Sequence, residues 1–237
     1  MIHPEGFTAI LDEVSRTLRH MQDTGIRGVD CAPESLDKLN AWGRGHEMAS
    51  AGFTETLEDI RAHLGECQRC KLCRSRTRIV FGAGNSQARL MFIGEGPGHE
   101  EDRTGEPFVG AAGQLLNRII EAIRLNRQDV YIANVVKCRP PGNRLPEPEE
   151  IATCSPFLNR QIRAIRPRFI CTLGSCAAQN LLNTQEAVSR LRGRFFDHEG
   201  IRVLPTYHPA YLLRNPEKKR EVWEDMKLLM KEYPYEG

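Results

Sequence analysis

Three polar segments with residue types suited to binding or catalysis each follow a run of apolar residues. They are GEGPGHEED beginning at Gly94, NVVKCRPPGNR beginning at Asn134 and PTYHPAYLLR beginning at Pro205. A packed scaffold does not need glycine, proline, histidine, asparagine and carboxylates after every strand, so this repetition indicates a site. We expect the three segments to meet at one edge of a sheet and to form a binding or catalytic cleft there.

The first segment is a glycine-rich turn that carries carboxylates. Gly94, Gly96 and Gly98 let the backbone turn sharply and approach a ligand, and Pro97 stiffens the turn. The spacing is neither that of a dinucleotide-binding loop nor that of a P-loop, and the acidic side chains would repel a phosphate. An acidic surface loop is the alternative interpretation of these residues alone.

Phe108, Asn134 and His208 are the side chains in these regions that suit a flat polar ligand. Phe108 lies in a loop of small and polar residues, where an aromatic ring is either a core plug or a stacking platform. Asn134 offers a donor and an acceptor together, as the edge of a nucleobase requires. A single histidine or asparagine is more often structural, but the common location of His208 and Asn134 at strand ends favours a functional role.

Cysteines form a second group with possible chemistry. Cys67 and Cys70 are one helical turn apart, while Cys138 follows the second strand and Cys154 precedes Ser155-Pro156, which we expect to begin a helix. Four sulfur ligands suit zinc or an iron–sulfur cluster, and spacing does not choose between them. Cys73 continues the spacing of Cys67 and Cys70, so the ligand set stays open at this point.

The remaining cysteines are not expected to form disulfides, because a reducing cytosol does not favour a disulfide framework among the eight in the chain. Cys171 and Cys176 flank an apolar run and are interpreted as small core residues. Cys31 lies in a polar, irregular stretch and has no assigned role.

The elements that position these groups alternate along the chain. Strands are predicted over 89–94, 130–136, 168–174 and 201–204. Helices are predicted over 56–64, over 115–123 and from Pro216, with Asn215 as its cap. Apolar strands alternating with helices predict an α/β fold whose mostly parallel sheet is covered on both faces and binds ligands beyond the carboxyl ends of its strands.

The domain boundary is predicted near residue 53. Residues 1–53 contain one short helical pattern and then scattered glycine, proline and charge, so we interpret them as an accessory helical and flexible segment. Residues 54–237 form the main domain.

Composition argues against some classes of protein but does not identify the function. A net charge of +2 is too small to indicate a nucleic-acid partner, and no secretory leader or long apolar span is found. We therefore expect a soluble cytoplasmic protein with no membrane contact. Basic residues beside the expected cleft either track a phosphate backbone or are ordinary solvated charge; they are Arg139, Arg144, Arg192, Arg194, Arg214, Lys218, Lys219 and Arg220.

Taken together, the motifs resemble those of the family 4 uracil-DNA glycosylases, the iron–sulfur branch of that superfamily. The matching motifs are Cys67-x-x-Cys70, GEGPGHEED, GEPFVGAAGQLL, YIANVVKCRPPGNR, Cys154 with Pro156-Phe157-Leu158, and HPAYLLR, in that order between residues 60 and 232. The resemblance implies a three-layer α/β/α fold around a four-stranded, mostly parallel sheet. It implies a [4Fe-4S] cluster with Cys67, Cys70, Cys138 and Cys154 as ligands.

The resemblance also implies an activity. Such hydrolases flip uracil out of single- or double-stranded DNA and cut its N-glycosidic bond in base excision repair, and we expect a monomer. Phe108 would stack on uracil, Asn134 would bind its Watson–Crick edge and His208 would donate a hydrogen bond to the base oxygen that gains charge.

The resemblance gives further residues a place in the site. Gly96 and Gly98 would line the base pocket. Glu95 and Glu101 are the acidic candidates for positioning water or stabilising the cationic sugar, and Glu101 would also exclude the methyl group of thymine. The best-known branch of the superfamily has an aspartate at the place of Gly96, so the group that activates water is not assigned.

The base-flipping step would need a wedge. By resemblance, Leu212 and Leu213 would fill the gap that the flipped base leaves. Two alternatives of other classes are a DNA-binding protein that recognises uracil without excising it and a metal-dependent protein that binds small nucleotides. The acidic first loop fits the second alternative poorly.

Overall fold

A computed structural model describes residues 55–234, and the predicted accessory segment 1–53 lies outside them. Four parallel strands form the centre of one sheet: β2 (Leu90–Gly94), β3 (Tyr131–Asn134), β4 (Phe169–Leu173) and β6 (Ile201–Thr206). Every residue of β2, β3 and β4 is buried, which explains the continuous apolar runs in the sequence. The predicted α/β class and the four central strands are confirmed.

The sheet is wider than predicted, because an antiparallel strand is added at each edge. The strand order is β1-β3-β2-β4-β6-β5, with β1 (Ala83–Gly84) antiparallel to β3 and β5 (Phe196–His198) antiparallel to β6. The expected four-stranded sheet is thus the parallel centre of a six-stranded one. Strands as short as β1 and β5 carry no readable alternation of apolar and polar residues.

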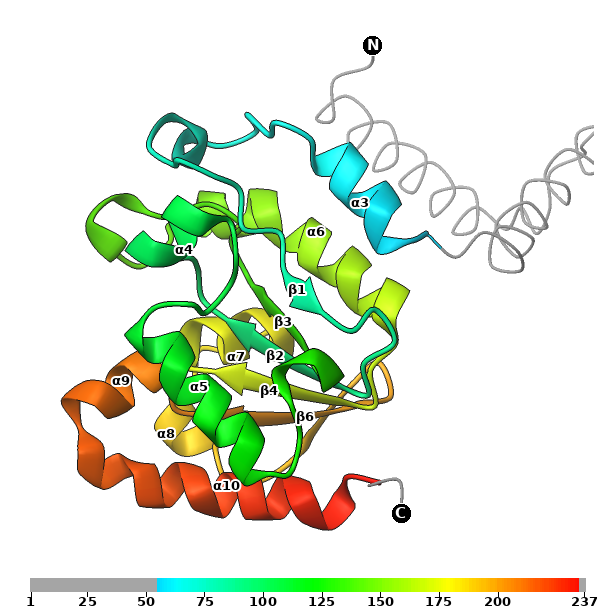
Figure 1. Cartoon of the computed structure of the whole chain (residues 1–237), viewed down its shortest axis with the longest axis vertical. Coiled ribbons are helices and arrows are strands. Elements are labelled where there is room, and N and C mark those ends of the chain that lie inside the picture. The colour runs from blue at the N-terminus through cyan, green and yellow to red at the C-terminus, as the bar shows by residue number, and fades with distance from the viewer. Residues whose placement is uncertain (1–54, 235–237) are drawn as a thin grey trace, which may run out of the picture. The chain divides into compact units, whose positions relative to one another are not determined.

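Helices cover both faces of the sheet (Figure 1). Side chains of α5, α8, α9 and α10 pack in one core cluster with Phe92 and Leu204, and side chains of α6 and α7 pack in another with Met91 and Ile170. This is the expected three-layer arrangement. The helices are α3 (Leu57–Leu64), α4 (His99–Thr104), α5 (Ala111–Ala122), α6 (Pro148–Ile165), α7 (Ser175–Leu182), α8 (Val188–Leu191), α9 (Pro209–Arg214) and α10 (Lys219–Glu232). The 3-10 turns are η1 (Lys71–Arg74), η2 (Arg127–Asp129), η3 (Pro141–Asn143) and η4 (Pro216–Lys218).

Helix α6 begins earlier than the sequence indicated. The prediction that Pro156 starts a new helix is wrong, because α6 begins at Pro148 and continues through Pro156. Pro148 is suited to a first turn, where its missing N–H has no partner to lose, and the Glu150 carboxylate accepts from the backbone N–H of Glu147 at 2.8 Å. Cys154 therefore lies in the middle of a continuous helix.

The helix near the start of the described region lies where it was predicted, whereas the last helix, predicted to begin at Pro216, begins three residues later. Thr56 caps α3 by accepting from the backbone N–H of Asp59 at 3.1 Å, and Gly65 ends this helix with a positive φ. Asn215 and Pro216 begin the 3-10 turn η4, and α10 proper begins at Lys219. Within residues 55–234, no helix is long and apolar enough to cross a membrane.

Candidate base-binding cleft and cysteine site

The carboxyl ends of the parallel strands bring the predicted segments together. Gly94 at the end of β2 is in register with Asn134 at the end of β3. A Cβ atom at Gly94 would lie 2.4 Å from Oδ1 of Asn134 and 2.6 Å from Cζ of Phe108. Gly94 must therefore be glycine for the amide and the aromatic ring to approach the strand end from either side.

The Asn134 side chain combines burial with an unpaired hydrogen-bond acceptor. Its residue is 1% exposed, and Oδ1 is buried with no hydrogen-bond partner. A buried acceptor without a donor costs about 1–3 kcal/mol, so such an atom in a folded protein needs a reason. Oδ1 lies close to the Phe108 ring, since a Cβ atom at Gly94 would approach both within 2.6 Å. A ligand that carries a hydrogen-bond donor could satisfy this acceptor.

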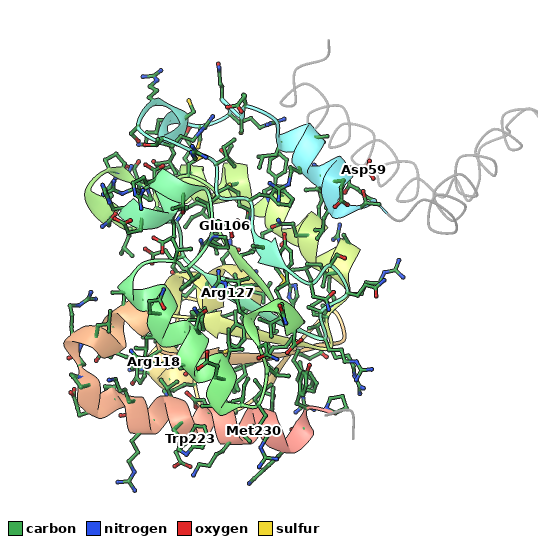
Figure 2. The ribbon with its side chains drawn as sticks, in the orientation of Figure 1. Asp59, Glu106, Arg118, Arg127, Trp223 and Met230 are labelled. Atoms are coloured by element: carbon green, nitrogen blue, oxygen red, sulfur yellow. The ribbon has the colours of Figure 1, made fainter. Side chains whose placement is uncertain are left out.

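Phe108 is held in a conformation that aromatic residues rarely adopt. Its φ is 52°, in the left-handed region, and its ring centroid lies 5.5 Å from that of His208 with the planes tilted by 33°. Arg127, labelled in Figure 2, donates to the backbone oxygens of Pro107 and Phe108. A Cβ atom at Gly113 would lie 1.9 Å from the Phe108 oxygen, so α5 packs directly against this loop.

Glu101 connects the glycine-rich turn to the Phe108 loop. Its Oε2 accepts from the backbone N–H of Gly98 at 3.1 Å, and its Oε1 accepts from those of Val109 and Gly110 at 2.9 Å each. The residue is 8% exposed. Both carboxylate oxygens thus bind the protein's own backbone, which is the arrangement of a positioning residue.

Glu95 follows β2 and is partly buried. Burial raises the pKa of the Glu95 carboxyl above its ordinary value. A carboxylate with a raised pKa is a better base for water. Gly96 and Gly98, which follow Glu95 in the chain, are tightly packed against other parts of the protein. A Cβ atom at Gly96 would lie 2.8 Å from Cγ2 of Val136, and one at Gly98 would lie 2.7 Å from the Glu101 carboxylate.

His208 caps α9 with its ring. Nδ1 accepts from the backbone N–H of Ala210 at 3.0 Å, so the proton of the neutral ring is assigned to Nε2. Burial, with a smaller contribution from Arg214, lowers the pKa of His208 to about 4, and Glu101 opposes this shift. The imidazole is therefore neutral near pH 7 and presents an N–H donor.

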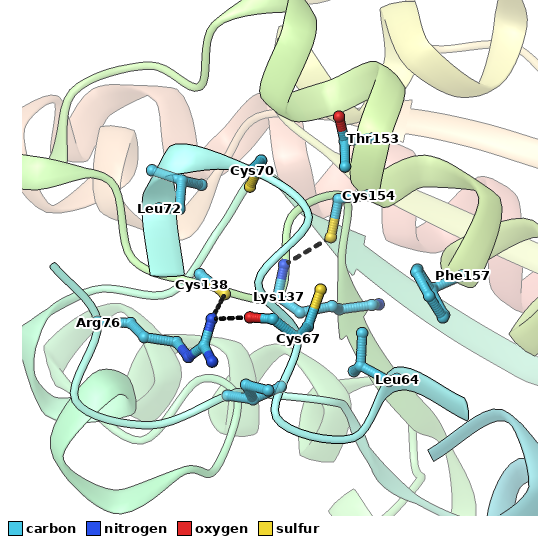
Figure 3. Close-up of a pocket in the computed structure, with 11 residues that line it drawn as sticks. Leu64, Cys67, Cys70, Leu72, Arg76, Lys137, Cys138, Thr153, Cys154 and Phe157 are labelled. Atoms are coloured by element: carbon cyan, nitrogen blue, oxygen red, sulfur yellow. Dashed lines mark hydrogen bonds between the residues drawn. The ribbon is translucent and has the colours of Figure 1, made fainter. Parts of the chain in front are cut away.

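The four predicted cysteine ligands line one cavity, although they come from separate chain segments (Figure 3). Cys67 and Cys70 lie before η1, Cys138 follows β3, and Cys154 lies on α6. Cys73 does not line this cavity. The candidate metal-binding cysteines that the spacing left open are therefore reduced to the four that do.

Hydrogen-bond donors already point at two of the sulfurs. Nη1 of Arg76 donates to Sγ of Cys138 at 3.5 Å, and the backbone N–H of Lys137 donates to Sγ of Cys154 at 3.3 Å. Burial raises the pKa of Cys138 to about 12 and that of Cys154 above its ordinary value, so a metal would have to displace thiol protons. Within residues 55–234, no three potential metal-binding side chains converge on one point as ligands of a single ion.

The structure separates residues that the sequence grouped. Leu212 is 1% exposed and belongs to the core, whereas Leu213 is 43% exposed.

Two of the basic residues predicted beside the cleft form ion pairs within the protein. Arg192 pairs with Asp225 at 2.8 Å, and Lys218 pairs with Glu221 at 2.6 Å. These two basic side chains are engaged within the protein.

Several residues that support the site were not singled out from the sequence. Arg127 and Gly113 hold the Phe108 loop, and Lys137 and Arg76 border the cysteine cavity. A glycine inside the amphipathic pattern of α5 was a readable signal of close packing at Gly113. Basic residues in polar loops give no comparable signal, because most of them are solvated.

Comparisons with known proteins match the chain to one superfamily. Residues 81–227 match the family model described as the uracil DNA glycosylase superfamily. The chain is 47% identical over 182 residues to a type-4 uracil-DNA glycosylase of Saccharolobus solfataricus, covering 73% of this chain and 84% of that protein. It is 46% identical over 176 residues to that of Thermotoga maritima (73% and 92% covered) and 44% identical over 181 residues to that of Archaeoglobus fulgidus (73% and 91% covered).

Proposed function

Because the chain belongs to the type-4 uracil-DNA glycosylases, we propose that its cleft receives a uracil turned out of DNA and that the protein hydrolyses the bond between this base and deoxyribose. The product is an abasic site, the first intermediate of base excision repair. Taking the base out of the stack costs a few kcal/mol but exposes every polar atom of the base to the pocket.

The observation that carries this proposal is the buried Oδ1 of Asn134 without a partner. The Watson–Crick edge of uracil has an N–H donor between two carbonyl oxygens. Oδ1 of Asn134 accepts from that N–H, and its amide donates to the neighbouring carbonyl. Base binding thereby removes the cost of the unpaired acceptor, which a base without the matching N–H does not do.

Phe108 and His208 complete the pocket in this proposal. The Phe108 ring stacks on the base, and Nε2–H of His208 donates to the base oxygen on which negative charge grows as the glycosidic bond breaks. A neutral donor suits this role, because the departing base stays an anion and does not take a proton from the ring. Fixed donors of this kind contribute about 2.7–4 kcal/mol to other reactions that develop an oxyanion.

The two carboxylates receive different roles. Glu95, with its raised pKa, orients the attacking water or stabilises the cationic sugar. Glu101 holds Gly98 and the Phe108 loop through its three backbone contacts, so we assign it to positioning. The prediction that Glu101 acts directly on water, on the sugar or on the choice against thymine stays a prediction. The prediction that Gly96 and Gly98 line the base pocket also stays a prediction, and the close packing of both glycines supports it.

The cysteine cavity fits an iron–sulfur group by its donor set. Four thiols line it, and N–H donors face Cys138 and Cys154, as is favourable for metal-bound thiolates. We assign Cys67, Cys70, Cys138 and Cys154 as ligands of a [4Fe-4S] cluster. When bound, the cluster would fasten the chain before the sheet to β3 and α6. Iron and acid-labile sulfide, measured per chain after anaerobic purification, separate this assignment from zinc.

The DNA partner is proposed on the same basis. Leu213, which is exposed beside the cleft on α9, is the wedge that fills the vacated stack, and the buried Leu212 supports it. We expect a monomer that acts in the cytoplasm on uracil in single- or double-stranded DNA.

An oligonucleotide with one uracil tests the function. Incubation with the protein should make the strand alkali-labile at uracil and leave a matched thymine strand intact. Asn134→Ala should lower the excision rate by about 100-fold, with unchanged circular dichroism, because it removes the acceptor of the base N–H. Absence of cleavage in U:G, U:A and single-stranded substrates would refute the proposal. A stable complex without released base would instead indicate recognition without excision.

A further inference from the structure

Lys137 is a buried lysine that lies between the cysteine cavity and the base pocket. It is 1% exposed and ranks among the largest fully buried side chains. It lines the cavity with Cys138 and Cys154, and it follows Asn134 by three positions in the chain. Lysine is rarely buried without a partner, so the surroundings of this side chain must compensate its burial.

The ammonium group of Lys137 belongs to a fixed polar network. Nζ donates to the backbone oxygen of Asn134 at 2.7 Å and to Oε1 of Gln161 at 2.6 Å. Nε2 of Gln161 in turn donates to the backbone oxygen of Phe81 at 2.9 Å and to the Tyr131 hydroxyl at 3.3 Å. These contacts anchor Nζ to the sheet from two directions.

The turn that follows Asn134 is held from both sides. The backbone N–H groups of Val135 and Val136 donate to the oxygens of Gly94 and Glu95 at 2.9 and 3.1 Å. Nζ of Lys137 fixes the carbonyl of Asn134 on the other side of the turn. This contact fixes the backbone of Asn134, from which its side chain extends.

The charge of Lys137 has no anionic partner among the carboxylates of residues 55–234: the two acceptors of Nζ are neutral oxygens. A buried ammonium is costly unless an opposite charge compensates it. Lys137 lines the same cavity as Cys138 and Cys154, and its backbone N–H, rather than its ammonium, donates to Sγ of Cys154 at 3.3 Å. The cavity thiols are therefore the nearby groups that become anions when metal binds. Four thiolates outweigh the positive charge of a common iron–sulfur core.

The geometry points to Lys137 as a positioning residue that couples the two sites: its ammonium compensates the metal-bound thiolates and its hydrogen bond holds Asn134 for base recognition. The kinetic half of this inference rests on the proposed function. The cofactor half does not depend on uracil excision, because it concerns only the charge of the metal-bound thiolates.

Lys137→Met tests the inference, since methionine has a similar length but neither charge nor donor. Lys71→Met is the matched control, because Lys71 lies next to Cys70 but has a side chain that is 48% exposed. Iron release to a chelator should be about tenfold faster in Lys137→Met than in wild type, and the visible circular dichroism of the cluster should change. Lys71→Met should match wild type in both measurements. Unchanged iron release and an unchanged spectrum in Lys137→Met would overturn the cofactor half.

A double-mutant cycle with Asn134→Ala tests the kinetic half. If Lys137 acts through Asn134, Lys137→Met should lower kcat/KM for uracil excision about tenfold in wild type but less than about threefold in the Asn134→Ala background. If the two substitutions instead lower kcat/KM by independent factors that multiply in the double variant, the kinetic half is overturned. If Lys137→Met fails to fold, Lys137→Gln, which removes the charge but keeps a hydrogen-bond donor, takes its place in the iron-release experiment with the same expected direction. Gln161→Met, which removes one acceptor of Nζ, then takes its place in the double-mutant cycle. A wild-type protein that excises no uracil refutes the proposed function, and iron release still decides the cofactor half.

Discussion

His208 gives the sharpest test of the proposed chemistry, because its protonation state decides whether it can act as a neutral donor. Protonation would place a hydrogen on Nδ1, where the ring now accepts from the backbone N–H of Ala210 at 3.0 Å. It would also place a positive charge in a largely buried position near Arg214. Burial, followed by the nearby charge of Arg214, lowers the pKa of His208 to about 4, compared with about 6.5 for an ordinary histidine.

The size of the effect follows from these two values. At pH 5 a group with a pKa of about 4 is about 90% neutral, whereas one with a pKa of about 6.5 is about 3% neutral. If the neutral ring is the active form, excision at pH 5 by Glu95→Gln, which lacks the titration of that carboxyl, should stay close to its rate at pH 7.5. A solvent-exposed histidine in the same role would lose about 30-fold.

The assay is single-turnover excision from a labelled uracil oligonucleotide between pH 5 and pH 8, with alkali used to reveal the abasic site. Glu95→Gln serves as a control, because the raised pKa of Glu95 adds its own titration to the wild-type profile. His208→Asn serves as a second control, because it cannot ionise. The ring can also be titrated directly by nuclear magnetic resonance.

A fall in rate with a midpoint near pH 6.5 that persists in Glu95→Gln and disappears in His208→Asn would refute the reasoning.

The pH dependence of stability is an independent measure of the protonation of His208. As the pH falls from about 6.5 to about 4, the unfolded chain binds a proton at His208 that the folded chain does not bind. The free energy of unfolding should therefore fall by up to about 3 kcal/mol through this window, and His208→Asn should lack that component.

Three further predictions concern the supports of the site. Cys138→Ala should lose iron and lower the Tm, whereas Cys73→Ala should keep both, as iron analysis and thermal denaturation will show; equal iron in the two variants contradicts the ligand set. Arg127→Met should raise KM by about tenfold at nearly constant Tm, since two carbonyls that hold the Phe108 loop lose their donor; an unchanged KM argues against this role. Leu213→Ala should slow excision from duplex DNA by about tenfold and leave single-stranded substrate within about twofold, and equal losses on both would exclude a wedge.

The centre of the fold was predictable because its strands are buried on both faces. The apolar runs that end at Gly94 and Asn134 have no polar alternation, so their length and order indicated parallel strands. The meeting of the polar segments was predictable for a related reason, since residues that follow several such strands must share one edge. The edge strands β1 and β5 were not predictable, because they are too short to show a period.

The support of the pocket could not be predicted, because it depends on tertiary contacts. Phe108 adopts its left-handed conformation only because Arg127 and Gly113 fix the loop from outside, and nothing in the local sequence requires it. Pro156 has the sequence pattern of a helix start, because proline is common at a first turn, but a helix already formed from Pro148 continues through it. Lys137 gives no signal of its burial in the sequence, because most lysines are solvated.

The cysteine cavity joins parts of the chain that are distant in sequence, and this has a consequence for the entropy of the unfolded chain. Between Cys70 and Cys138 lie β1, β2, α4, α5 and β3, including the loop of Phe108. A group bound to both cysteines closes this stretch into a ring, and cross-links that close rings of such length stabilise folded chains by on the order of 4 kcal/mol. Most of the base pocket then lies inside the ring. Its resistance to proteolysis should follow the iron content of the protein, although no pocket residue needs to contact the metal.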